Sequence, residues 1–262
     1  MRPTAYLAAA LLAPLCAWAQ ADYPETRVNP FPEELPEYQI YRTDQGVAID
    51  GKADEADWQQ ADEIHFLFPW NNTEQEGEQG TLARMLWDDS NLYISYVCVD
   101  PYLESKVTDH DGPVYKEDAV EIFATPNPED PSAYFGYEMN IRDALLDYIA
   151  FGGGTEWTKN IHPPWQSEGV KIATTYQGTL DDHSDTDQGW TLEIAIPFDN
   201  FRHLDGTIPP QDGDLWRLNL NRTKGEKGQF SQWADSRADR PSFHHSAFFG
   251  KAFFTDKKVG GQ

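Results

Sequence analysis

Cysteine and positively charged residues are scarce in this sequence of 262 residues. It contains 2 Cys and 3 Met, and 20 Lys and Arg stand against 44 Asp and Glu. The resulting net charge of −24 repels phosphate groups, so binding to nucleic acid or to an anionic lipid surface is not expected. No apolar run is long enough to span a bilayer, so membrane insertion is not expected either. The short motifs of zinc proteases, nucleophile elbows and phosphate-binding loops are also missing.

The N-terminus has the pattern of an export signal. Arg2 precedes an apolar run over residues 5–18, and Ala17-Trp18-Ala19 matches a cleavage site flanked by small residues. We therefore expect residues 1–19 to be a signal peptide that is cut after this motif, and the protein to be secreted or periplasmic. Cleavage leaves Cys98 as the only cysteine. It alternates with apolar residues and is interpreted as a core residue, so no intramolecular disulfide is expected.

The rest of the chain has the signature of one β domain. Four prolines among acidic residues predict an extended leader over 20–40, and a single β domain is expected over 41–256, with a tail over 257–262. The predicted fold class is all-β: an antiparallel β-sandwich of immunoglobulin-like or jelly-roll type, with long loops and one short helix over 54–62. Strands are predicted over 47–49, 82–87, 92–99, 120–124, 134–141, 145–150, 170–175, 190–196, 215–221, 229–233 and 247–254.

Polar residues recur at alternate positions in several of these predicted strands. Because residues i and i+2 of a strand share a face, the alternation predicts one apolar face and one polar face. Such a polar face offers donors and acceptors to sugar hydroxyl groups, although a solvated outer face would have the same pattern. The residues predicted on the polar face include Glu121, Glu138, Asn140, Arg217, Asn219 and Asn221.

An ordered set of short segments resembles the family 9 carbohydrate-binding modules and their stand-alone relatives. The resemblance extends from about Val47 to Phe254 and implies a β-sandwich, related to the DOMON domains, that binds a sugar without cleaving it. The segments that carry it are Ile49-Asp50-Gly51, Ala83-Arg84-Met85-Leu86-Trp87-Asp88, Glu117-Asp118-Ala119-Val120-Glu121-Ile122-Phe123, Gly189-Trp190-Thr191-Leu192-Glu193-Ile194-Ala195-Ile196-Pro197, Trp233-Ala234-Asp235 and Phe249-Gly250.

The resemblance implies a site in which two aromatic rings enclose a terminal sugar. Tyr115, just before the D-A-V-E-I-F segment, and Phe243, shortly before the final F-G, stand at the positions of these rings. Glu121 matches a family Glu that bonds sugar hydroxyls. Glu138 stands where the family has Arg, and Asn140 follows two residues later. This acidic replacement makes a basic sugar, a differently hydroxylated sugar or a bridging cation alternatives to a cellulose or xylan chain end.

Further residues are expected to contribute to sugar binding. Arg217 is predicted to bond the rim of the sugar, and aromatic rings are predicted to stack on its faces. Trp157 and Trp165 lie in a long loop over 151–169, where they either add a ring to the site or anchor the loop. The expected partner is an oligo- or polysaccharide, with a separately encoded glycan-active enzyme as a further expected partner, and no catalytic residue is assigned.

A structural calcium ion is another implication of the resemblance. The segment over 181–189 is rich in carboxylates and ends in D-x-D-x-G, so Asp185 and Asp187 are the predicted ligands. A simple acidic hairpin is the alternative interpretation of the same residues.

Two other functions stay open as hypotheses. A haem b-binding cytochrome of the DOMON type would need a methionine ligand, and Met85 and Met139 are the candidates left after signal cleavage. A glycoside-cleaving enzyme would use Glu121 and Glu138 as its pair of carboxylates.

Overall fold

A computed structural model of the protein describes residues 34–43, 46–70, 79–152, 161–162, 165–224 and 229–261. These residues are mostly in β-strands, and none of their helices is long and apolar enough to cross a membrane. The strands are β1 (Glu37–Arg42), β2 (Ile64–His65), β3 (Thr81–Trp87), β4 (Asn91–Val99), β5 (Asp118–Thr125), β6 (Ala133–Asn140), β7 (Leu145–Phe151), β8 (Ile161–His162), β9 (Lys171–Gln177), β10 (Gly189–Pro197), β11 (Leu215–Lys224), β12 (Gln229–Gln232) and β13 (Gly250–Lys258). The helical segments are α1 (Ala56–Gln60) and the 3-10 turns η2 (Val114–Lys116), η4 (Phe198–His203) and η5 (Ser246–Phe248).

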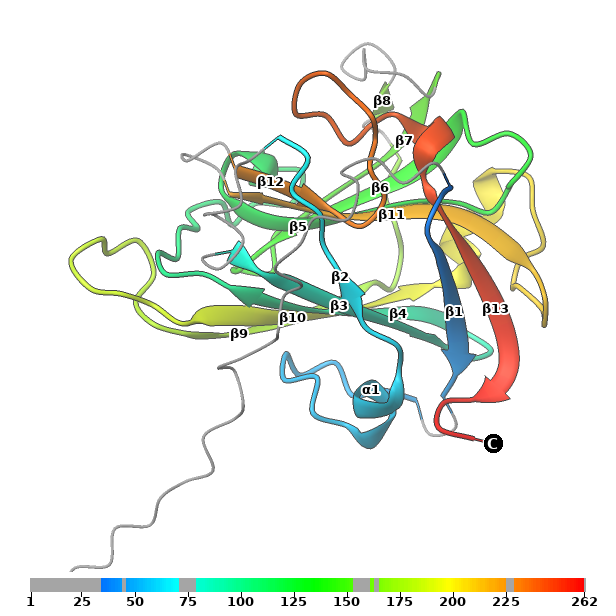
Figure 1. The fold of residues 1–262 in the computed structure, drawn as a ribbon, viewed down its shortest axis with the longest axis horizontal. Helices are drawn as coiled ribbons and strands as arrows, with labels where there is room; N and C mark the ends of the chain where they lie inside the picture. The colour runs from blue at the N-terminus through cyan, green and yellow to red at the C-terminus, as the bar shows by residue number, and fades with distance from the viewer. Residues whose placement is uncertain are drawn as a thin grey trace, which may run out of the picture.

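All the strands belong to one hydrogen-bonded sheet that curls into two facing layers. The strand order is β8-β7-β6-β5-β11-β13-β1-β3-β4-β10-β9, with β12 added to β11 and β2 added to β3. In Figure 1, β5, β6, β7 and β11 form the upper layer, β3, β4, β9 and β10 form the lower layer, and β1 and β13 connect them at one side. The predicted all-β sandwich with one short α-helix is therefore confirmed.

Strand β1 departs from the sequence-based prediction. It is parallel to both neighbours, with Tyr38 opposite Ala252 on β13 and Tyr41 opposite Leu86 on β3. Residues 37–40, the last four of the predicted leader over 20–40, belong to this strand. The predicted strand over 47–49 is not formed, and β13 extends past the predicted domain end at 256.

The core lies between the two layers, where the predicted alternation is confirmed. Trp216, Leu218 and Leu220 of β11 point into the core, as do the fully buried Met85 and Met139. Cys98 is a buried free thiol in the same core, as predicted. The alternate residues of β5, β6 and β11 consequently point to the outer face of the upper layer.

A buried carboxylate on β10 holds the turn at Asp50-Gly51. Glu193 is fully buried, and its Oε2 accepts hydrogen bonds from the backbone N–H groups of Asp50 (3.1 Å), Gly51 (2.7 Å) and Lys52 (3.2 Å). Its Oε1 accepts a bond of 2.7 Å from Nε1 of Trp58 on α1. Two of the segments that carry the family resemblance thus meet at a structural contact and not at a ligand site.

A buried ion network joins the ends of β4, β5 and β11. Asp100, directly after β4, accepts bonds from Nη2 of Arg222 (2.8 Å) and from Nζ of Lys224 (2.6 Å). Lys224 also lies 3.2 Å from Asp118, which faces it across the β5–β11 ladder. The network fixes the start of β5, directly after η2, and η2 carries Tyr115.

Candidate functional site

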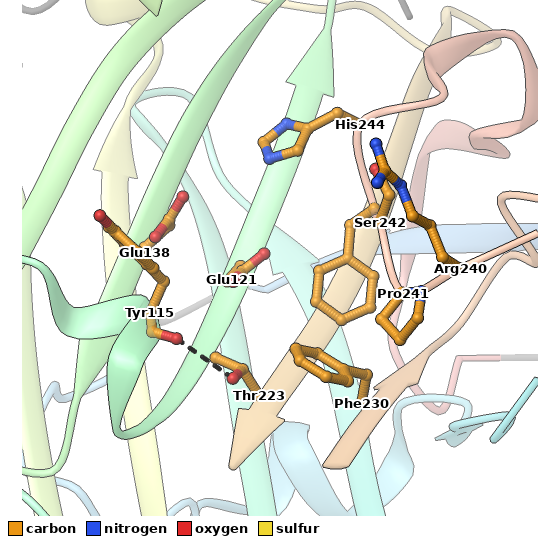
Figure 2. Close-up of a pocket in the computed structure, with 10 residues that line it drawn as sticks. Tyr115, Glu121, Glu138, Thr223, Phe230, Arg240, Pro241, Ser242 and His244 are labelled. Carbon is orange, nitrogen blue, oxygen red and sulfur yellow. Dashed lines mark hydrogen bonds between the residues drawn. The ribbon is translucent and has the colours of Figure 1, made fainter. Parts of the chain in front are cut away.

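A depression of about 330 Å³ opens on the outer face of the upper layer (Figure 2). Strands β5, β6, β11 and β12 supply its floor and one edge, and a segment over 240–244 covers its opposite side. Half-exposed aromatic and buried acidic groups therefore meet in one hollow. The lining residues are Tyr115, Glu121, Glu138, Thr223, Phe230, Arg240, Pro241, Ser242, Phe243 and His244.

Two carboxylates form the polar floor of this pocket. Glu121 on β5 and Glu138 on β6 stand directly opposite each other in the antiparallel ladder, which places their Cβ atoms about 5 Å apart. Both side chains are buried, at 4% and 3% exposure. The Oε1 atom of Glu138 accepts a bond of 2.8 Å from the Tyr148 hydroxyl. The Oε2 atom of each glutamate is buried and finds no hydrogen-bond partner among the described residues.

Burial and mutual repulsion make both carboxyl groups hard to ionise. Burial, reinforced by the negative charge of Glu138, raises the pKa of Glu121 well above its usual range. Burial also raises the pKa of Glu138 to about 7, although the hydrogen bond from Tyr148 opposes this rise. Like charges at such short range titrate as a pair, so the two groups hold a proton between them near neutral pH.

Gly136 gives Tyr148 the space it needs to reach Glu138. The two residues are opposite each other in the β6–β7 ladder. A Cβ at position 136 would lie 2.3 Å from a ring carbon of Tyr148, so the ring lies directly over this glycine. Strand β6 thus has no side chain where the Tyr148 ring crosses it. The Tyr148 hydroxyl therefore reaches the carboxylate of Glu138, two residues further along β6.

One wall of the pocket is a cluster of aromatic rings. The segment over 233–249, which includes the covering residues 240–244, contributes Phe243 to this cluster. The ring centroids of Phe243 and Phe230 lie 6.0 Å apart, and Trp70 packs against Phe243 with centroids 5.8 Å apart. Nε1 of Trp70 donates a bond of 2.8 Å to the carbonyl of Ala238, which fixes the covering segment. Phe243 is only 5% exposed, so it serves both as packing and as pocket wall.

His244 attaches the covering segment to the sheet. Its ring stacks on Phe123 with centroids 4.8 Å apart, and its Nδ1 lies 2.6 Å from the Tyr134 hydroxyl. Burial lowers the pKa of His244 to about 3, so the imidazole is neutral at physiological pH. Consequently, it adds no positive charge to the pocket.

The other wall is formed by Tyr115 on η2. Its ring is 36% exposed, and its carbonyl accepts a bond of 3.3 Å from the Thr223 hydroxyl of β11. In Figure 2, Tyr115 and Glu138 lie on one side of Glu121, and Pro241 and Arg240 lie on the other. A flat molecule placed over Glu121 would therefore have aromatic or apolar groups on both sides.

The structure brings four of the predicted binding residues together and separates two others from them. Tyr115, Glu121, Glu138 and Phe243 all line the pocket. Asn140 does not: its Nδ2 donates to the carbonyl of Val107 and to Glu117, and its Oδ1 accepts from two backbone N–H groups of the β6–β7 turn.

Arg217 is also outside the pocket. Its guanidinium donates to the carbonyls of Phe249 and Ala247 at 2.6–2.9 Å, so it fixes the backbone that leads into β13. Burial lowers the pKa of Arg217. Both Asn140 and Arg217 thus form hydrogen bonds within the protein, and neither lines the pocket.

The two loop tryptophans have different outcomes. Trp165 packs on Phe135, with centroids 5.1 Å apart, and on Tyr137, so its ring lies against the core and does not line the pocket. Trp157 lies outside the described residues.

The predicted calcium segment has its carboxylates engaged with the backbone. Oδ1 and Oδ2 of Asp187 accept the N–H groups of Thr179 (2.7 Å) and Leu103 (2.8 Å), whereas Asp185 is exposed. Ca²⁺ takes six to eight oxygen ligands, and each oxygen of Asp187 already accepts a backbone hydrogen bond, so the calcium site stays a prediction beside the acidic-hairpin alternative. In the described part of the chain, metal-ligand atoms instead gather at His110, Asp111 and Asp147, on the opposite face of the sheet from the pocket.

Sequence reasoning missed Phe230, His244, Arg240 and Trp70. Phe230 lies opposite Thr223 of β11, and this pairing depends on the register of the β11–β12 ladder, which the sequence does not reveal. The positions of the other three residues depend on how the covering segment folds over the sheet. No periodicity in the sequence predicts this arrangement.

A β-sandwich with an aromatic-walled polar pocket on one sheet face has the features of a carbohydrate-binding domain. The family model described as "Carbohydrate family 9 binding domain-like" matches residues 49–257, and this chain belongs to that family.

Relatives and solved structures agree with this assignment. Exoglucanase XynX of Acetivibrio thermocellus is 28% identical over 81% of this chain, which spans 17% of that relative's length. A structure from Bacteroides uniformis has a TM-score of 0.65 at 18% identity, covering 84% of this chain and 100% of the other. A family 9 carbohydrate-binding module from Caldicellulosiruptor kristjanssonii, solved with cellotriose, has a TM-score of 0.57 at 15% identity, covering 84% and 93%. At these identities the structural matches establish the fold.

Proposed function

We propose that this protein binds one sugar unit of an oligo- or polysaccharide in the pocket over Glu121 and Glu138, and that it does not cleave the sugar. The observation that carries the proposal is the pair of buried carboxylates with unpartnered oxygens, at the floor of a pocket with aromatic walls. A pyranose has apolar C–H faces and a rim of hydroxyl groups. Tyr115 and the Phe230–Phe243 wall suit the faces, and the carboxylates suit the rim.

The expected affinity is moderate. Each ring contributes about 1 kcal/mol beyond the area it buries, by analogy with aromatic pairs. Hydrogen bonds to a charged acceptor are about twice as strong as bonds between neutral groups. Association and the ordering of a flexible sugar oppose these gains, so we expect dissociation constants of roughly micromolar to millimolar size.

Binding without cleavage follows from the placement of the two carboxylates. Glycoside hydrolysis requires carboxyl groups that flank the scissile bond, one as acid and the other as base or nucleophile. Glu121 and Glu138 project from neighbouring strands of the same sheet face, so both meet a bound sugar from one side. The family of this chain is likewise a family of binding domains.

Calorimetry of the full chain against oligosaccharides tests the proposal. We expect Tyr115→Ala and Phe230→Ala each to weaken binding about tenfold, because each removes a stacking wall. Tyr176→Ala is the matched control, since Tyr176 is an exposed ring on β9, in the other layer. Equal binding by all three variants would place the site elsewhere, and release of product from a labelled oligosaccharide would contradict the absence of cleavage.

The same proposal includes export and a partner. The N-terminal pattern at residues 1–19 supports a location outside the cytoplasm, where polysaccharides occur. A separately encoded glycan-active enzyme is the proposed partner. N-terminal sequencing of the protein recovered from culture medium or periplasm tests the export, and an uncleaved N-terminus in the cytoplasm would contradict it.

A further inference from the structure

We propose that the sugar bound in this pocket carries a protonated amine, as in a 2-amino-2-deoxy hexose, and that the amine lies between Glu121 and Glu138. This inference rests on the proposed sugar-binding function and names the class of sugar. The geometry that points to it is the cross-strand pairing of two buried carboxylates on the pocket floor.

The two carboxylates have no cation partner in the part of the chain that the structure describes. None of the ion pairs formed by the described residues includes Glu121 or Glu138, and one oxygen of each is buried without a hydrogen-bond partner. A buried carboxylate oxygen without a partner is costly, and two adjacent carboxylates repel each other unless they hold a proton or a cation lies between them. By contrast, the buried Asp100 and Asp118 are paired with Arg222 and Lys224, so this fold supplies cations to buried acids elsewhere.

No described group around the pair is recorded in an ion pair with either carboxylate. The Tyr148 hydroxyl donates to one oxygen of Glu138, and Tyr134, on the same strand face, is bonded to the neutral His244. Asn221 faces Glu121 from β11, and an amide carries no charge. On the covering segment, Arg240 is an exposed residue at the rim of the pocket, across from Glu138 in Figure 2.

An amino sugar fits these conditions better than a neutral one. A protonated amine has three N–H donors and one positive charge, so it satisfies both unpartnered oxygens and cancels their repulsion at once. A hydroxyl group has one donor and leaves one carboxylate oxygen unsatisfied. The apolar faces of a hexosamine ring remain available for Tyr115 and for the Phe230–Phe243 wall.

The experiment compares three β-1,4-linked trimers that differ only at C2: glucosamine, N-acetylglucosamine and glucose. Binding of each to the full chain is measured by calorimetry at neutral pH and 150 mM NaCl, with and without EDTA. We expect the glucosamine trimer to bind at least about tenfold more tightly than the other two. Glu138→Gln and Glu121→Gln should each bring the ratio of the glucosamine-trimer and glucose-trimer affinities close to one, and Glu129→Gln, an exposed site, should keep the preference for glucosamine.

Each contrary outcome has a distinct meaning. Equal or tighter binding of the glucose trimer would overturn the amine inference and leave the sugar-binding function intact. A preference for glucosamine that survives both Gln variants would overturn it too, because attraction to the negative net charge would then explain the binding. Binding of neutral trimers that EDTA abolishes would replace the amine with a bridging metal ion. Failure of all three trimers to bind would contradict the proposed function itself.

Discussion

Glu193 accepts a hydrogen bond from the backbone N–H of Gly51 at 2.7 Å, although 142 residues separate them in the chain. Gly51 has a φ of +81°, and a Cβ there would lie 2.8 Å from the backbone of Thr174. The turn therefore needs both a glycine and a buried acceptor from β10. This relationship explains why an I-D-G segment and a W-T-L-E-I segment occur together in such a chain.

Replacement of this acceptor should destabilise the domain. In Glu193→Gln the side chain loses its charge, and one of its two terminal atoms becomes a donor that faces N–H groups. We expect the free energy of unfolding to fall by about 3 kcal/mol, the size of a lost bond to a charged group with its unsatisfied partners. Urea denaturation measures the change. Glu129→Gln serves as the exposed control, and a loss as small in Glu193→Gln as in this control would contradict the assigned role.

The buried ion network predicts a larger loss. Asp100→Asn removes the carboxylate partner of Arg222 and leaves Lys224 with Asp118 as its carboxylate partner, so it should cost about 3–5 kcal/mol. The exposed pair between Lys251 and Glu37 is the comparison, and Lys251→Met should cost less than about 1 kcal/mol. Chemical denaturation measures the free energy of unfolding of both variants. Similar decreases in the two would show that the buried network adds no more stability than the exposed pair.

Gly136 and Tyr148 allow a test of how the pocket floor is supported. Gly136→Ala should displace the Tyr148 ring, destabilise the domain by about 1–3 kcal/mol through overpacking, and break the bond to Glu138. Tyr148→Phe removes that bond alone, so it should retain most of the stability and raise the pKa of Glu138 further. Thermal melts and carboxyl NMR titration separate the two effects, and an unchanged Glu138 pKa in both variants would contradict the contact.

The raised pKa of Glu138 makes stability depend on pH near neutrality. Between the usual carboxyl pKa of about 4.5 and the folded value of about 7, the native state binds more protons than the unfolded chain. The free energy of unfolding therefore falls as pH rises through this range. Below pH 6.5 the lowered pKa of His244 acts in the opposite direction, because there the unfolded chain binds the extra proton.

The effect of Glu138 on stability is therefore best measured between pH 6.5 and 8, above the usual pKa that His244 has in the unfolded chain. We expect the melting temperature of the protein to fall by several degrees across this window and that of Glu138→Gln to fall less. Burial also raises the pKa of Glu121 and the pKa of Asp118, so these two groups account for the fall that remains in the variant. Glu129→Gln should behave like the unmodified chain. A fall of the same size in Glu138→Gln would show that other groups carry the pH dependence.

Much of the layered fold could be predicted from the sequence because alternation in long strands is a strong signal. Trp216, Leu218 and Leu220 alternate with polar residues over a single uninterrupted strand, so their burial followed directly. Strand β1 was missed because its residues, E-Y-Q-I-Y-R, follow a proline-rich stretch and pair in parallel with strands far along the chain. Local pattern contains no information about such partners.

The pocket was only partly predictable for a related reason. Glu121 and Glu138 were assigned to one polar face, but their direct opposition depends on the register of the β5–β6 hairpin. Asn140 shares their strand pattern, yet it lies at the strand end and bonds the adjacent turn. The aromatic cover is set by a segment without periodicity, so Trp70, Phe230 and His244 became visible only in three dimensions.

Strand β1 lies between β13 and β3 and joins the two edges at which the curled sheet would otherwise part. A chain that begins after residue 43 would present both edges unpaired, each with a row of free backbone donors and acceptors. The gap accepts a parallel strand of sequence E-Y-Q-I-Y-R from any source, including the same strand of a second molecule. Truncated protein is therefore expected to self-associate through its two open edges, and a synthetic peptide of this sequence should restore the monomer.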